Sequence, residues 1–299
     1  MKRIVKYLIY RSIAKPIYSL LRGFYLPSEK MRRRLRFIGK FRVNSRDGKK
    51  FYLYNNAFHL ENHIYWLGID AYPWERMTRR IWIKLCRESS SIFDIGANSG
   101  IYAILAKVYN AEAEVHAFEP QPNVYRVLEK NNELNEFDIH CVQLALSNQA
   151  GRQPFYNYGP GTFTTENTTG GSLNREWIRK DRQSILVDVK RLENYIEENS
   201  IAGINLIKID VETLEYEVLL GYGRYLEQHE PVIILEIQDR EIGINVESLL
   251  NSGRYAYFNI YEQSGLFRVS ELGNSGNNLN YLLCPHSKLD KVKEFIIAE

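Results

Sequence analysis

The sequence has few cysteines, no long apolar run and little net charge. Among its 299 residues are three cysteines, Cys86, Cys141 and Cys284, with no Cys-x-x-Cys spacing. Their odd count and their place in apolar stretches predict reduced thiols, buried as small hydrophobic side chains in a reducing, cytoplasmic compartment. The longest apolar stretches fall short of about eighteen residues, so the sequence predicts no membrane-spanning helix.

The small net charge of +3 conceals an uneven distribution. Residues 1–40 contain twelve Lys or Arg residues and one acid, so the remaining 259 residues carry a net charge of about −8. Such a body lacks the basic surface with which proteins bind nucleic acid, and we expect no nucleic-acid partner. Hydrophobic residues make up 44% of the chain and charged residues 25%, as is typical of a soluble globular protein.

The basic segment 1–40 begins with the pattern of an amphipathic helix. Ile4, Leu8, Arg11 and Lys15 recur at helical spacing, with basic residues between the apolar ones. A helix of this kind can lie on an anionic bilayer, here the inner face of the cytoplasmic membrane. Alternatively, its apolar face packs on the protein's own body or on a second copy in a homo-oligomer. The sequence leaves these alternatives open.

The rest of the chain divides into a lead-in region, 41–90, and a main domain, 91–299. In the lead-in region, Asp47-Gly48 marks a hairpin turn, and Met77, Ile81 and Leu85 predict a helix within 73–88. Strands are predicted at 91–95, 114–118, 139–144, 204–209, 231–236, 255–261 and 280–284. Helices are predicted at 99–109, 122–135, 190–198, 213–224 and 245–252.

This alternation predicts an α/β fold with a doubly wound, mostly parallel seven-stranded sheet of Rossmann-like type. The last two strands have no strong helical segment between them, so we expect them to form a hairpin at one edge. Residues 157–175 form an irregular insertion rich in Gly and Thr.

A glycine turn after the first strand of the main domain suggests the ligand. Asp94 precedes Gly96 and Gly100, and Glu119 ends the next strand. The glycine set of a dinucleotide site is incomplete, and Asp94 would repel a pyrophosphate, which disfavours an NAD-dependent oxidoreductase. Glu119 suits the hydroxyls of a ribose, and Asp94 suits a cationic group. S-adenosylmethionine has both a ribose and a positive charge, and no phosphate.

Four blocks in order, FDIGANSGIYA, FEPQPNVYRVLEKNNELN, ALSN and IKIDVETLEYEVLLG, resemble the FkbM family of S-adenosylmethionine-dependent methyltransferases over about residues 60–285. The resemblance implies a class I methyltransferase fold and O-methylation of a sugar or natural-product hydroxyl. It also implies a set of cofactor-binding residues: Asp94, Gly96, Asn98, Gly100, Glu119, Ala145 and Leu146. Thr213 departs from the family's usual glycine, and its extra side chain at a strand-to-helix turn could narrow the acceptor site.

Carboxylates at neighbouring strand ends are candidates for catalysis. Asp210 follows NLIKI, Glu236 ends VIILE, and Glu212 lies at the start of the next helix. One of them could act as a general base on the acceptor hydroxyl. Asp210 and Glu236 could instead hold Mg²⁺. A structural role for Glu236 stays open as well.

Other side chains are weaker candidates. His116 and His140 are expected to be satisfied core or surface residues, and His59 and His63 are four residues apart with no third metal ligand in register. Tyr156, Tyr158, Phe163 and Trp177 border or lie within the insertion and could stack on a sugar ring.

These observations predict an O-methyltransferase acting on a sugar or glycan hydroxyl in cell-envelope polysaccharide biosynthesis. Two alternatives remain. The acceptor is a natural-product hydroxyl, or the chain is a non-catalytic nucleoside-binding module in which Thr213 is the inactivating change.

Overall fold

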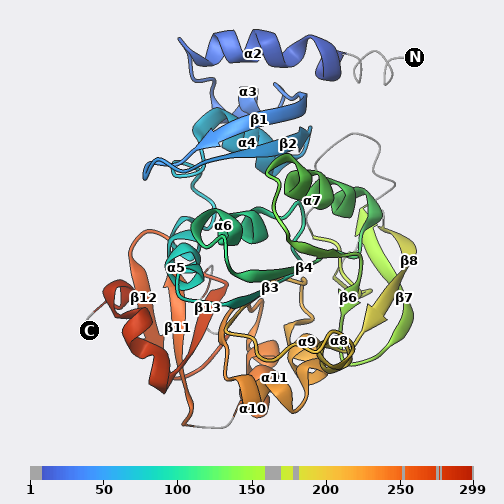
Figure 1. Ribbon diagram of the computed structural model, residues 1–299, viewed down its shortest axis with the longest axis vertical. Coiled ribbons are helices and arrows are strands. Elements are labelled where there is room, and N and C mark those ends of the chain that lie inside the picture. The colour runs from blue at the N-terminus through green and yellow to red at the C-terminus, as the bar shows by residue number, and fades with distance from the viewer. Residues whose placement is uncertain are drawn as a thin grey trace.

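The N-terminal part of the chain forms a small layer on top of the main domain. The computed structural model describes residues 9–158, 170–177, 182–250, 253–273, 276 and 278–297. In Figure 1, helix α2 lies across the outer side of this layer, with an antiparallel hairpin and helix α4 beneath it. Its elements are α2 (Ala14–Arg22), α3 (Glu29–Arg32), β1 (Ile38–Asn44), β2 (Lys50–Asn56) and α4 (His59–Leu67). The hairpin predicted around Gly48 is confirmed.

The main sheet has the predicted doubly wound arrangement and one strand more than predicted. Its order is β12-β11-β13-β10-β9-β3-β4-β5, in which β13, β11 and β12 pair antiparallel and the others parallel. The strands are β3 (Ser91–Ile95), β4 (Glu114–Phe118), β5 (His140–Val142), β9 (Leu206–Ile209), β10 (Val232–Glu236), β11 (Tyr255–Tyr261), β12 (Gly265–Val269) and β13 (Asn280–Pro285). The two strands predicted to form the edge hairpin, β11 and β13, do pair antiparallel, but the eighth strand, β12, lies between them in the sequence and forms the edge hairpin with β11. The partly exposed GLFRV sequence of β12 gave no strong strand signal.

Helices cover both faces of this sheet, which is why its central strands are apolar throughout. All five residues of β3 and all four of β9 are buried. Figure 1 shows α5 (Arg76–Cys86), α6 (Ile101–Tyr109) and α7 (Pro122–Leu134) above the sheet. Below it lie α8 (Leu192–Glu198), α9 (Glu215–Tyr222), α10 (Tyr225–His229) and α11 (Arg240–Leu249). Two 3₁₀ turns, η1 (His286–Lys291) and η2 (Lys293–Phe295), follow β13 near the C-terminus.

A second, three-stranded sheet beside the main one was not predicted. It has the order β6-β8-β7, with strands β6 (Ala145–Leu146), β7 (Gly151–Tyr158) and β8 (Arg182–Lys190). The single strand predicted at 139–144 corresponds to β5 in the main sheet, and β6 follows it in the small sheet. Sequence reasoning missed β7 and β8 because Pro154 interrupts one and exposed apolar residues, such as Leu186, blur the alternation of the other.

The helices predicted in the lead-in region and the main domain form, and the largest difference is at α11. Ile4 and Leu8, on which the N-terminal amphipathic helix was predicted, lie outside the described residues. This helix begins at Arg240 and not at 245, because the Asp239 carboxylate accepts a hydrogen bond from the backbone N–H of Ile242, 3.0 Å away, and caps the helix. Among the described residues, no helix combines the length and the apolar character needed to cross a bilayer.

Candidate active site

The glycine turn after β3 brings three parts of the chain together. Gly96 has φ +80°, and a Cβ atom there would lie 1.9 Å from the backbone oxygen of Asp210, so only glycine fits between the ends of β3 and β9. Gly100 has φ +86° and starts α6, where a Cβ atom would lie 2.4 Å from the Leu128 side chain. The two glycines therefore set how closely β9 and α7 approach the turn.

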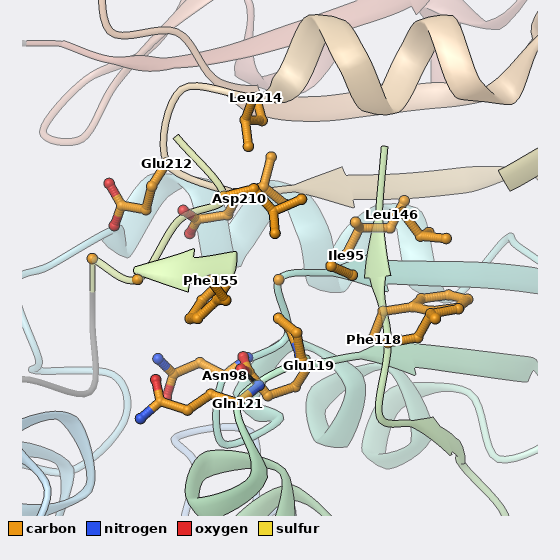
Figure 2. A pocket seen from close by; sticks show the side chains of 18 residues that line it. Ile95, Asn98, Phe118, Glu119, Gln121, Leu146, Phe155, Asp210, Glu212 and Leu214 are labelled. Atoms are coloured by element: carbon orange, nitrogen blue, oxygen red, sulfur yellow. Dashed lines mark hydrogen bonds between the residues drawn. The ribbon is translucent and has the colours of Figure 1, made fainter. Parts of the chain in front are cut away.

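A first cavity of about 110 Å³ opens at this turn, beyond the carboxyl ends of β3, β4 and β9. Five of the seven predicted cofactor-binding residues line it: Gly96, Asn98, Glu119, Ala145 and Leu146. In Figure 2, Phe118, Ile95 and Leu146 lie together at one end, whereas Asp210 and Glu212 lie across the cavity from Glu119. Gly100 lines neither this cavity nor a second, adjoining cavity, and its role is to shape the turn.

The Glu119 carboxylate is oriented by the backbone around it. Its two oxygens accept hydrogen bonds from the N–H groups of Asn98, at 3.1 Å, and Gln121, at 2.8 Å. Burial raises the pKa of this carboxyl to about 7. Each oxygen keeps a further lone pair, so the group can accept hydrogen bonds from the hydroxyls of a ligand.

A second cavity of about 370 Å³ adjoins the first. The two share Gly96, Asn98, Asp210 and Glu212 as lining residues. The second cavity is also lined by Asp94, Glu236 and aromatic residues from the lead-in region, and α4 contributes His59, Leu60 and Ile64. The N-terminal layer therefore forms one wall of this cavity.

A buried lysine lies among the carboxylates of the second cavity. The Lys208 ammonium group is 2.7 Å from a carboxylate oxygen of Asp210, and its nitrogen lies 4.5 Å from the centre of the Tyr102 ring. Burial lowers the pKa of Lys208, but Asp210, Glu75 and Asp94 outweigh this effect and raise it. Lys208 is therefore charged and neutralises part of the acidic wall.

Asp94 is held by the fold as well as exposed to the cavity. Its Oδ2 accepts a hydrogen bond from the backbone N–H of Ala103, 3.0 Å away in α6. Burial raises its pKa to about 7. Asp94, which was predicted to bind the cofactor, thus lines the second cavity and not the first.

The predicted catalytic acids converge. Ligand atoms of Asp210, Glu212 and Glu236 all lie within 4.8 Å of one another. Burial, followed by the nearby Asp210 carboxylate, raises the pKa of both Glu212 and Glu236. In the described part of the chain, Asp210 has an ion-pair partner and the two glutamates have none.

Thr213 adopts a backbone conformation that favours glycine. It has φ +80° and follows Glu212, which has φ +56°. Its hydroxyl oxygen accepts a hydrogen bond from the Asn174 side-chain amide, 2.8 Å away, and the Ser172 hydroxyl donates to the Glu212 carbonyl at 2.8 Å. Thr213 lines neither cavity, so its side chain ties the 170–177 segment to the turn and does not fill the acceptor site.

The aromatic residues expected to stack on a sugar do not line the site. Tyr156 and Trp177 line neither cavity, and Phe163 and the side chain of Tyr158 lie outside the described residues. Instead, Tyr72 and Trp74 line the second cavity, and Trp74 is 68% exposed. Gly170, Gly171 and Leu173, from the described end of the insertion, line the first cavity.

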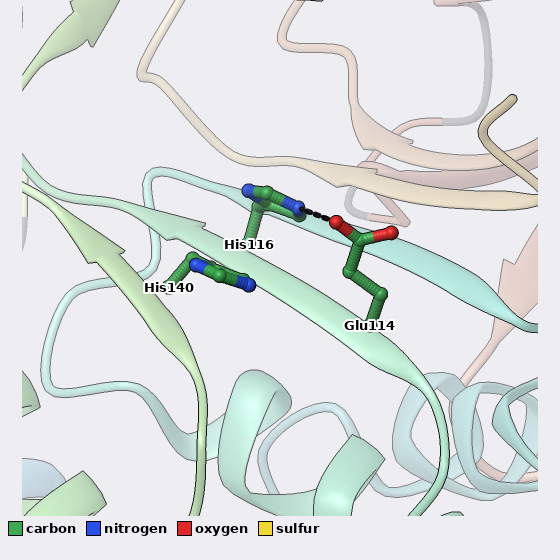
Figure 3. Close-up of side chains that lie close together, drawn as sticks. All are labelled: Glu114, His116 and His140. Atoms are coloured by element: carbon green, nitrogen blue, oxygen red, sulfur yellow. Dashed lines mark hydrogen bonds and ion pairs between the residues drawn. The ribbon is translucent and has the colours of Figure 1, made fainter. Parts of the chain in front are cut away.

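The histidines lie outside the two cavities, apart from His59. His116 is buried, and its ring nitrogens lie 2.8 Å from the Tyr195 hydroxyl and 3.0 Å from Glu114 (Figure 3). The exposed His140 stacks on its ring at 4.5 Å. The expectation of satisfied core and surface histidines is confirmed. Ligand atoms of Glu114, His116 and His140 lie within 4.8 Å of one another, so these residues are the second group of potential metal ligands in the described part of the chain, beside the three acids of the site. His59 and His63 belong to neither group.

Comparison with known proteins decides the family. The profile of the Methyltransferase FkbM domain matches residues 94–262, more than half of the chain and all of the site except its lead-in wall and the segment around Asn280. The chain belongs to the FkbM methyltransferase family. Its sheet order and its site at the carboxyl ends of the strands are those of a class I methyltransferase fold.

Three named relatives each match between half and two thirds of this chain. Methyltransferase sdnD of Sordaria araneosa is 30% identical over 53% of this chain and 71% of its own. The 31-O-demethyl-FK506 methyltransferase FkbM of Streptomyces tacrolimicus is 26% identical over 62% of this chain and 79% of its own. Hexuronic acid methyltransferase AglP of Haloferax volcanii is 25% identical over 52% of this chain and 59% of its own.

The residues present fit S-adenosylmethionine. Glu119 presents an oriented carboxylate for ribose hydroxyls, and the apolar end of the first cavity, with Phe118 and Leu146, suits a nucleobase. Gly96 leaves room where a Cβ atom would collide, and the acids shared by the two cavities suit a positively charged group.

Sequence reasoning missed Lys208, Glu75 and Trp74. Lys208 left a signal, because a charged residue inside an otherwise apolar strand needs a buried partner. Glu75 and Trp74 belong to a segment that precedes the main domain, and nothing in their spacing indicates that they line the second cavity.

Proposed function

We propose that this FkbM-family methyltransferase transfers a methyl group from S-adenosylmethionine to a hydroxyl of a sugar or glycan. The observation that supports it best is the pair of adjoining cavities with Asp210 and Glu212 at their shared boundary. The exposed Trp74 ring in the second cavity suits the apolar face of a sugar, and the name of the hexuronic acid relative agrees with such an acceptor. Cell-envelope polysaccharide is the setting that we propose for it.

In this proposal the chain's own acids handle the proton of the acceptor hydroxyl. When bound, S-adenosylmethionine supplies an electrophilic methyl group on a positively charged sulfur, and its transfer to the acceptor oxygen leaves S-adenosylhomocysteine. Glu212 borders both cavities and has no ion-pair partner among the described residues, so we assign it the role of accepting the hydroxyl proton. Asp210 holds Lys208 in place, and Glu236 faces the acceptor side only.

A Mg²⁺ ion held by Asp210 and Glu236 is the alternative to this base. The three acids lie close enough together to share an ion. A metal would acidify the acceptor hydroxyl and remove the need for a base. The two alternatives differ in their response to chelation.

The test measures S-adenosylhomocysteine formation with a panel of hexuronic acids, hexoses and sugar nucleotides. Glu212→Gln should lower turnover by about 10²-fold or more while leaving affinity for S-adenosylhomocysteine within about threefold. Turnover that EDTA abolishes and Mg²⁺ restores would assign the acids to a metal. Normal turnover in the Glu212→Gln enzyme would reject Glu212 as the base.

A natural-product hydroxyl is the second candidate acceptor. Leu60, Ile64, Ile69 and Ile101 give the second cavity an apolar side, and the name of the FkbM relative refers to such a substrate. Turnover with a macrolide alcohol in the same panel of acceptors decides between a sugar hydroxyl and a natural-product hydroxyl. S-adenosylhomocysteine binding without turnover on any acceptor would leave the non-catalytic nucleoside-binding module as the better description.

A further inference from the structure

The largest concentration of exposed apolar side chains in the described residues lies near the N-terminus. Nine of the fourteen exposed large apolar side chains lie between residues 9 and 31. Ile13, Ile17, Leu20, Leu21 and Phe24, which we call the α2 patch, recur at helical spacing on α2 and the turns at its ends. Leu20 is 68% exposed and Phe24 is 83% exposed.

The opposite face of α2 is docked on the protein, which fixes the direction of the α2 patch. Ala14 is buried, and the Tyr18 ring lies 5.6 Å from the Trp66 ring of α4. The Ser19 hydroxyl hydrogen-bonds with the Tyr65 hydroxyl at 3.0 Å. The helix therefore uses one apolar face for folding and presents a second one outward, on the outer side of the N-terminal layer (Figure 1).

The charge around the α2 patch selects between possible occupants. Residues 9–40 contain nine Lys or Arg residues and one acid. Two copies that met patch to patch would bring two of these basic segments together, and their repulsion opposes a symmetric dimer. An anionic bilayer accepts the apolar side chains and attracts the basic ones.

We propose that the chain docks on an anionic membrane surface through the α2 patch. Helix α4 connects the membrane-facing helix α2 with the active site. Its residues Tyr65 and Trp66 contact α2, and its residues Leu60 and Ile64 line the second cavity. The further conclusion that the acceptor is a glycan held at the membrane rests on the proposed function.

The experiment measures co-sedimentation of the full chain with vesicles of phosphatidylcholine, with and without one third phosphatidylglycerol. The wild-type chain should bind the anionic vesicles at least about tenfold more strongly, and less strongly as salt is added. The double variant Leu20→Glu/Phe24→Glu should reduce this binding at least about tenfold. Both side chains are exposed, so the variant should fold normally.

The matched control is Ile244→Glu on α11, because Ile244 is 52% exposed and lies outside the N-terminal layer. It should bind vesicles like the wild type. Unchanged binding of the double variant, or no binding of the wild type, overturns the proposal. The proposal is also overturned if the wild type binds no vesicles but forms a dimer that the double variant abolishes. That result would show that a second copy covers the α2 patch.

Turnover on a soluble acceptor separates this inference from the proposed function. The double variant should keep the wild-type turnover, because the α2 patch lines neither cavity. If the chain binds vesicles but methylates no acceptor, the proposed function is rejected and the proposed docking on a membrane surface stands.

Discussion

The ammonium group of Lys208 lies 2.7 Å from the carboxylate of Asp210, and only 4% of the lysine side chain is exposed. Lys208 lies in β9 and Asp210 comes directly after this strand, so an apolar strand places a buried positive charge among the acids that line the second cavity. Glu75 and Asp94, from two other segments, act on the same lysine and raise its pKa. One cation therefore compensates acids that the chain brings together from three places.

Removing this cation should destabilise the protein. In Lys208→Met the surrounding carboxylates lose their buried counter-charge, and we expect the free energy of unfolding to fall by about 3 kcal/mol or more. Urea denaturation followed by circular dichroism measures the change. Lys208→Met/Asp210→Asn should recover part of the loss, because it also removes one of the uncompensated charges.

The control for this prediction is Lys293→Met. Lys293 also forms an ion pair, but 73% of its side chain is exposed, so the change should stay within about 0.5 kcal/mol. A Lys208→Met protein as stable as this control would show that the acids are compensated by other means.

Glu119→Gln should change how stability depends on pH. Burial raises the pKa of Glu119 in the folded protein to about 7, above its value in the unfolded chain. The folded state therefore holds the proton more tightly, and wild-type stability falls as pH rises from about 4.5 to 7 and then levels off. Because glutamine cannot ionise, the stability of the Glu119→Gln protein does not show this part of the decline with pH.

Unfolding of both proteins at pH 5 and pH 8 measures the effect. From the lower to the higher pH, Glu119→Gln should gain up to about 3 kcal/mol relative to the wild type. Its affinity for S-adenosylhomocysteine at pH 8 should drop by about tenfold or more, since a charged hydrogen-bond acceptor is lost. A stability difference independent of pH would contradict the raised pKa, and unchanged affinity would contradict the ribose assignment.

Thr213 allows backbone strain and a hydrogen bond to be separated. Thr213→Ala removes the hydrogen bond to Asn174 and keeps a Cβ atom at φ +80°, whereas Thr213→Gly removes both. We expect the glycine variant to be more stable than the alanine variant by about 1–2 kcal/mol, because only glycine adopts this conformation without strain. Thermal unfolding of the two variants provides the comparison.

Asn174→Ala completes this comparison, since it removes the same hydrogen bond and leaves Thr213 in place. Turnover of Thr213→Gly should stay close to that of the wild type, because Thr213 lines neither cavity. A glycine variant that gains activity over an inactive wild type would instead identify Thr213 as an inactivating change.

The parts of the fold and site that the sequence predicts are those encoded locally. Asp94, Gly96 and Glu119 each lie at the end of an apolar strand or in the turn after it, and parallel strands bring such ends to one edge. Asp210, Glu212 and Glu236 converge for the same reason. The glycine at 96 is required by its contact with the Asp210 backbone, which local spacing could only suggest.

What the sequence does not predict depends on contacts between distant segments or on weak local signals. Glu75 reaches the site because the lead-in region folds over the main sheet, and no local pattern encodes that arrangement. Strands β7 and β8 pair with each other beside the main sheet, where exposed side chains such as Leu186 remove the usual alternation. Asp239 did carry a signal as a helix cap, but the apolar spacing placed the helix start later.

Trp74 provides a test of the acceptor class. This residue is 68% exposed and lines the second cavity, so its side chain is accessible to a ligand. If a sugar ring stacks there, Trp74→Ala should raise the KM for the acceptor about tenfold and leave the affinity for S-adenosylhomocysteine unchanged. Trp74→Phe should keep most of the affinity, since an aromatic face remains. The control is Trp177→Ala, because Trp177 lines neither cavity and should leave both constants unchanged. An acceptor KM that responds to Trp177→Ala and not to Trp74→Ala would place the sugar on the side of the insertion, as the sequence alone suggested.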